Sequence, residues 1–154
     1  MKSLTLTAAL MMGLACAPDK PKNTEEFPEA SKSAPEAVLT DPAKGIGAIK
    51  NVTLKTPIET DRVSRGLAIY EMKCSACHKL DDQRFVGPGW KGVTERRQPE
   101  WIMNMVTNVE VMLDKDEEAQ KLLELCLTRM PNQNVSIGDA RDILEFMRKN
   151  DGVK

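Results

Sequence analysis

The sequence predicts an all-α fold for residues 59–154, on the strength of two observations. Apolar residues recur there at intervals of three and four in four separate segments, as they do on one face of a helix. Residues 74–78 read C-x-x-C-H, the signature for covalent haem attachment, and no strand pattern flanks them. We therefore expect a helical domain wrapped around one covalently bound haem.

The spacing of the pentapeptide matches the chemistry of haem attachment. The thiols of Cys74 and Cys77 can add across the two vinyl groups of one haem, and His78 follows directly to offer an imidazole nitrogen to the iron. His78 is the only histidine in the chain, which excludes both bis-histidine ligation and a second C-x-x-C-H motif. The sixth iron ligand is then Met, a less usual group such as Lys, or nothing.

Two other interpretations of the cysteines stay open. A redox-active dithiol would favour a βαβ setting, which the sequence does not indicate. A zinc site could use Cys74, Cys77, His78 and Cys126, a legitimate ligand set. Because the side chains of the adjacent Cys77 and His78 start in different directions, they are awkward ligands for one small ion, and we favour haem.

Composition limits the classes of function. The net charge of −1 and the lack of a Lys/Arg stripe argue against a nucleic-acid partner. Aromatic residues make up only 4% of the chain, which is little for a core that must be self-sufficient, and a buried porphyrin would supply apolar surface. The four cysteines imply no disulfide framework, and we expect Cys126 to be a small buried residue on a helix.

Residues 1–17 resemble a secretory signal peptide, with Lys2 ahead of an apolar run over residues 4–15. The run is short for a membrane span. Cys16 ends a lipobox-like sequence, so we expect its lipidation and a periplasmic, membrane-anchored lipoprotein. The alternative is cleavage after Ala17 at an A-x-A site, which would discard Cys16.

A tether is expected over residues 18–44, where five prolines stand among Lys, Glu, Ser and Ala. A flexible chain of this length has an r.m.s. span of roughly 25–30 Å. Residues 45–58 are more apolar, and we expect them to extend along the surface of the domain formed by residues 59–154.

The first helix should start near Thr60 as N-cap and lead into Cys74. Gly66 costs about 1 kcal/mol within a helix, so we expect another helix to approach closely there. After His78, glycines and a proline predict a turn over residues 85–90. A ligating histidine usually donates its other ring N–H to a carbonyl, and we expect the acceptor in this turn.

Three more helices are predicted. The first of them begins with Pro99 and ends near Met112, and its apolar face is expected to pack against the haem. The second starts near Asp116. The third follows a capping box at Ser136 and ends near Gly152. Their apolar faces comprise Trp101, Ile102, Met105, Val106 and Val109; Leu122, Leu123 and Cys126; and Ile137, Ala140, Ile143, Leu144 and Met147.

The chain has nine methionines, so the choice of the sixth ligand depends on where each one lies in the predicted structure. Pro131 disfavours helix at Met130, which can therefore point inward from a loop. Met112 is the main rival, whereas Met103 and Met105 lie within a predicted helix and are interpreted as packing residues. Met130 is the preferred ligand.

With these motifs in place, residues 44–150 resemble class I c-type cytochromes. The resemblance implies haem attachment at Cys74 and Cys77 with His78 and Met130 as axial ligands. It also implies that the Pro88 carbonyl accepts the His78 proton. The pair Gly66 and Tyr70 would cross the last helix near Ile143 and Phe146. The expected haem pocket comprises Tyr70, Gly87, Pro88, Trp90, Trp101 and Arg129, with Arg129 a candidate partner for a haem propionate.

The implied function is one-electron transfer without bond chemistry on a substrate. Donors would be a quinol-oxidising complex or another cytochrome, and acceptors a terminal oxidase or reductase. Parts of the sequence are similar to small exported monohaem cytochromes, some associated with nitrous oxide respiration. If Met130 does not bind, a five-coordinate sensor or peroxidase-like protein is the alternative, followed by a zinc-binding structural lipoprotein.

Overall fold

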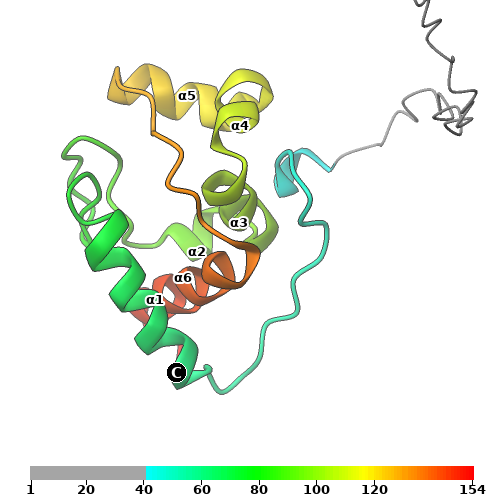
Figure 1. The fold of residues 1–154 in the computed structure, drawn as a ribbon, viewed down its shortest axis with the longest axis vertical. Helices are drawn as coiled ribbons and strands as arrows, with labels where there is room; N and C mark the ends of the chain where they lie inside the picture. Colours follow the sequence, from blue (N-terminus) through cyan, green and yellow to red (C-terminus); the bar gives the residue numbers. More distant parts are fainter. Residues whose placement is uncertain (1–40) are drawn as a thin grey trace, which may run out of the picture. The chain divides into compact units, whose positions relative to one another are not determined.

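A computed structural model describes residues 41–154, so the predicted signal peptide, Cys16 and most of the predicted tether lie outside the described residues (Figure 1). The described chain is helical and contains no strand, which confirms the predicted fold class. Its elements are η1 (Pro42–Lys44), α1 (Thr60–Lys73), α2 (Val93–Arg96), α3 (Pro99–Thr107), α4 (Val109–Lys115), α5 (Glu117–Cys126) and α6 (Ile137–Asn150).

The helix boundaries correct the sequence prediction in three places. The cap of α1 is Glu59 rather than Thr60, and α2 was not predicted. The single helix expected from Pro99 to Met112 is two helices, since Asn108 adopts a φ of −139° between α3 and α4. The Asn108 side chain donates a hydrogen bond to the Ile46 carbonyl, a contact between distant segments that no local pattern reveals.

Helices α1 and α6 cross (Figure 1), and Gly66 lies at the crossing, as the sequence predicts. A Cβ atom at Gly66 would collide with the carbonyl oxygen of Asp142 and would lie 2.8 Å from the Cβ of Phe146. Beside the crossing, the rings of Tyr70 and Phe146 pack with centroids 5.4 Å apart. The glycine therefore allows two backbones to approach at the point where the chain leads into the haem-attachment motif.

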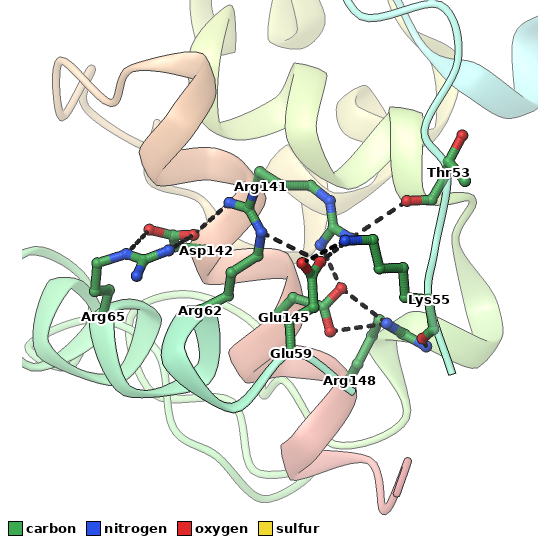
Figure 2. Close-up of polar contacts among 9 residues, drawn as sticks. All are labelled: Thr53, Lys55, Glu59, Arg62, Arg65, Arg141, Asp142, Glu145 and Arg148. Carbon is green, nitrogen blue, oxygen red and sulfur yellow. Dashed lines mark hydrogen bonds and ion pairs between the residues drawn. The ribbon is translucent and has the colours of Figure 1, made fainter. Parts of the chain in front are cut away.

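A network of ion pairs covers one side of this crossing (Figure 2). Asp142 on α6 accepts hydrogen bonds from Arg62 and Arg65 on α1, at 2.7 and 2.6 Å. Fully buried Glu145 is paired with Arg141 and Arg148. These two arginines also donate to backbone carbonyls at positions 53 and 55, so the network joins the N-terminal segment to α6.

Asp142 makes the stability of this crossing dependent on pH. Burial acts to raise the pKa of Asp142, but the hydrogen bonds from Arg65 and Arg62 outweigh it, so that the pKa lies below its ordinary value. A carboxylate with a lowered pKa stabilises the fold above its unfolded pKa of about 3.9, and this stabilisation is lost as the pH falls through the folded pKa. Asp142→Asn should therefore lower the unfolding free energy at pH 7, with a difference from wild type that shrinks as the pH falls below the unfolded pKa and through the lower folded pKa.

Urea unfolding of the haem-loaded protein at several pH values measures this effect. Asp139→Asn is the matched control, because Asp139 is a half-buried residue on the same helix whose backbone N–H, and not its carboxylate, bonds the capping Ser136. An equal loss of stability at all pH values for Asp142→Asn would contradict the role of the ionised carboxylate.

Residues 45–58 have no regular secondary structure and follow the domain surface. Buried Asn104 on α3 holds this segment, because its amide donates to the carbonyls of Lys44 and Ile49 at 3.0 and 2.9 Å and accepts from the Ile49 N–H. Lys44 ends η1, so residues 42–44, predicted as the end of the tether, are helical and bonded to the domain. Among residues 41–154, no helix has the length and apolar character to cross a membrane.

Candidate functional site

A cavity of about 420 Å³ lies between the segment that follows α1, helices α2, α3 and α5, and the loop at residues 128–131. Its wall is mainly apolar, and its volume falls in the range of small-molecule and cofactor pockets. Cys77 and His78 reach it from the C-x-x-C-H motif. The packing of the helices thus leaves an apolar cavity next to the motif.

The motif forms a tight turn at the end of α1. The backbone N–H groups of Cys77 and His78 both donate to the carbonyl of Cys74, at 3.0 and 2.9 Å. Cys77 lines the cavity, while Cys74, the first cysteine of the motif, is buried in the core. Burial raises the pKa of the Cys74 thiol to about 11, so this thiol is protonated at neutral pH.

The imidazole of His78 has one nitrogen in use and one available. Nδ1 lies 2.9 Å from the Pro88 carbonyl, in the turn where the sequence predicts the acceptor. Since a carbonyl can only accept, Nδ1 carries the proton and Nε2 is left for a metal. Burial lowers the pKa of His78, partly opposed by the bond to Pro88, which favours the neutral ring that can bind a metal.

Gly87 and Trp90 pack directly on this imidazole. A Cβ atom at Gly87 would lie 2.8 Å from Nδ1 of His78. The centroids of the Trp90 ring and the imidazole are 5.6 Å apart. Tyr70, predicted as a pocket residue, is not among the residues lining the cavity. It lies behind the site, where its hydroxyl donates to the His78 carbonyl at 2.8 Å and its ring packs on Trp90.

Met130 reaches the cavity from the loop between α5 and α6, where the sequence places it. Met112, its rival, is fully buried, does not line the cavity, and accepts a hydrogen bond on its sulfur from the Ile46 N–H at 3.0 Å. Met105 and Met147 also line the cavity, from α3 and α6. Met130 differs from them because it does not belong to a helix.

Two predicted residues have other surroundings than expected. Arg129 lines the cavity, but its guanidinium donates to the exposed carboxylate of Asp114 at 2.8 Å. Cys126, predicted to be buried, is half-buried at the end of α5 and lines the cavity. Two lining residues that sequence reasoning missed are Arg96 and Arg97 at the end of α2, and their one sequence signal is a pair of consecutive arginines shortly before Pro99.

Trp101 lines the cavity, as predicted, and connects its walls. The indole N–H on α3 donates to Asp116 at 3.1 Å, and the same carboxylate oxygen accepts the backbone N–H of Ala119 and so caps α5. The guanidinium carbon of Arg97 lies 4.8 Å from the centre of the Trp101 ring. The indole therefore positions α5, whose Leu122, Leu123 and Cys126 form another part of the lining.

These donors fit an iron porphyrin better than a free metal ion. A porphyrin supplies four nitrogens itself and requires only axial ligands, which the imidazole of His78 and the thioether of Met130 can provide. Within residues 41–154, no three Cys, His, Asp or Glu side chains are grouped closely enough to hold a metal ion, so the zinc alternative lacks a ligand set there. The apolar wall suits a large aromatic ring.

Comparisons with known proteins agree with this geometry. A family model described as cytochrome c matches residues 63–151. The solved cytochrome c from Rhodothermus marinus is 34% identical, with a TM-score of 0.69 over 73% of this chain and 96% of that chain. An engineered form, Rma TDE, is 34% identical, with a TM-score of 0.68 over 72% of this chain and 98% of its own.

The same engineered protein bound to a carbene intermediate is 33% identical, with a TM-score of 0.65 over the same shares of the two chains, 72% and 98%. No curated protein matches. The family model spans more than half of the chain and includes the attachment motif, the His78 turn and the Met130 loop. The chain therefore belongs to the cytochrome c family.

Proposed function

We propose that this protein carries single electrons between exported redox proteins. Its family binds one haem c covalently and serves in haem-based electron transfer. The observation that supports the proposal most directly is the cavity itself, where His78, with its Nδ1 committed to Pro88, and the loop residue Met130 line the same apolar space.

The proposal assigns a role to each residue of the site. Cys74 and Cys77 would form the two thioether bonds, and the Pro88 carbonyl holds His78 in the tautomer whose Nε2 could bind the iron. Met130 would offer a neutral, soft sulfur as the second ligand, which favours the reduced state. When bound, haem supplies a reversible one-electron couple, and the apolar walls formed by α3 and α5 exclude water from it.

The proposed partners are proteins. A quinol-oxidising complex or another cytochrome would donate the electron, and a terminal oxidase or nitrous oxide reductase would accept it. The near-neutral charge of −1 supports neither a nucleic-acid partner nor a broad basic docking face. Salt should accordingly change the rate of electron transfer only modestly.

Two measurements on the purified protein test the function. A haem stain of a denaturing gel reports thioether linkage, because covalently attached haem stays with the chain after denaturation. The ferric optical spectrum reports the sixth ligand through the sulfur-to-iron band near its red end. A stained protein without this band that binds CO rapidly when ferrous would instead be the five-coordinate sensor or peroxidase-like alternative.

Lipidation of Cys16 gives a prediction about location. If the exported protein is anchored through a lipid on Cys16, then Cys16→Ser should release nearly all of it from the membrane into the soluble periplasmic fraction. Fractionation followed by a haem stain measures the distribution. Cys126→Ser is the matched control and should leave membrane association unchanged, whereas a Cys16→Ser protein that stays on the membrane would contradict the anchor.

A further inference from the structure

Arg97 and Glu118 form an ion pair at the wall of the cavity. The Arg97 guanidinium donates to a Glu118 carboxylate oxygen at 2.8 Å. Its carbon lies 4.8 Å from the centre of the Trp101 ring, and both Arg97 and Trp101 line the cavity, whereas Glu118 does not. The positive charge of Arg97 is therefore nearer than the negative charge of Glu118 to a haem in this cavity.

Arg97 is held in this place through α2, which is fastened by a residue near the C-terminus. Asp151, just after α6, accepts hydrogen bonds from the N–H of Gly92 and the N–H and hydroxyl of Thr94, at 2.6, 2.9 and 2.7 Å. These bonds secure the start of α2, and the Arg97 N–H then bonds the Val93 carbonyl at the end of that helix. Arg97 is thus a fixed part of the cavity wall, with its side chain only 24% exposed.

The two charges act on the redox couple in opposite directions. Reduction adds one electron, supplied by the donor protein, so the charge of the haem site falls by one. A nearby positive charge favours the reduced form and a negative charge favours the oxidised form, and both effects are strongest where water is excluded. Glu118 is 40% exposed and is shared with Lys121 at 2.6 Å, so it offsets Arg97 only in part.

We infer that the Arg97–Glu118 pair adjusts the reduction potential, with Arg97 raising it and Glu118 lowering it. This rests on the proposed function. Neither residue is a ligand of the iron, and both are positioning residues that act through the electrostatic field in the cavity. The pair differs from the exposed pair of Arg129 and Asp114, whose side chains are 52% and 59% exposed to the screening of solvent.

Redox titration of the haem-loaded protein tests the inference. Arg97→Gln should lower the midpoint potential, Glu118→Gln should raise it, and the double variant should lie between the two. Lys55→Gln removes a positive charge whose side chain is 68% exposed and does not line the cavity, and Glu117→Gln removes the carboxylate one position before Glu118 on α5. Both controls should shift the potential less than the corresponding test variant.

Shifts of the same sign in the two single variants, or shifts no larger than those of the controls, would overturn the inference. If the pair only fastened α2 to α5, both substitutions would lower the denaturant midpoint of unfolding without moving the potential in opposite directions. A protein that lacks attached haem or a reversible one-electron couple would instead defeat the proposed function, so the two failures can be told apart.

Discussion

Met130→Ala is expected to leave haem covalently attached while lowering the reduction potential by a sizeable part of the roughly 0.8 V over which axial ligands set haem potentials. The attachment residues Cys74 and Cys77 are distant in sequence from the loop that carries Met130, so thioether formation should not depend on it. Without the soft sulfur the reduced state loses its preferred ligand. Redox titration and the ferric optical spectrum measure the outcome.

The other methionines near the site provide the controls. Met112→Leu should keep the red-end band and the potential, because the Met112 sulfur is bonded to the Ile46 N–H away from the cavity. Met105→Leu should also keep them, although Met105 lines the cavity from α3. If the band survived in Met130→Ala and disappeared in Met105→Leu or Met147→Leu, the axial ligand would have to be reassigned.

Removal of the Met130 sulfur should leave one coordination position of the iron open, and this gives a second measurement. In the Met130→Ala protein the iron should bind CO rapidly when ferrous, whereas the wild type should bind it slowly. The proposed tautomer of His78 should be unaffected, since Pro88 is on a different segment from Met130. Equal CO binding in wild type and variant would mean that Met130 does not occupy the iron in the native protein.

The parts of this site that are visible in the sequence depend on local signals. A C-x-x-C-H motif defines attachment within five residues, a Gly-Pro turn follows at a short distance, and Pro131 disfavours helix at Met130. The close approach of another helix at Gly66 can also be predicted, because a glycine within a helical pattern usually has a packing reason. Each of these features is set by steric or covalent constraints on neighbouring residues.

The parts that sequence reasoning misses depend on contacts between distant segments. Helix α2 is only four residues long, too short for periodicity, and it is fastened by Asp151, which is more than fifty positions away. The break at Asn108 reflects a bond to Ile46. The ion pair between Arg129 and Asp114 on α4 likewise joins two segments that the sequence does not bring near each other.

Gly66→Ala should cause a large loss of stability. The new Cβ would collide with the carbonyl oxygen of Asp142 and lie 2.7 Å from the carbonyl carbon, so helices α1 and α6 would have to move apart. Overpacking of a core usually costs about 1–3 kcal/mol, and we expect the upper end because the obstacle is backbone. Denaturant unfolding of the haem-loaded protein measures this loss.

Gly138→Ala is the matched control, since Gly138 also lies in a helix but has open space around it. A Cβ there would meet only the hydroxyl of Ser136, at 3.7 Å, so the substitution should stabilise the protein by about 0.4–1 kcal/mol through the lower entropy of the unfolded chain. The opposite signs separate steric crowding at the α1–α6 crossing from the general effect of replacing glycine in a helix. Stabilisation by both substitutions would show that α1 and α6 do not approach closely at Gly66.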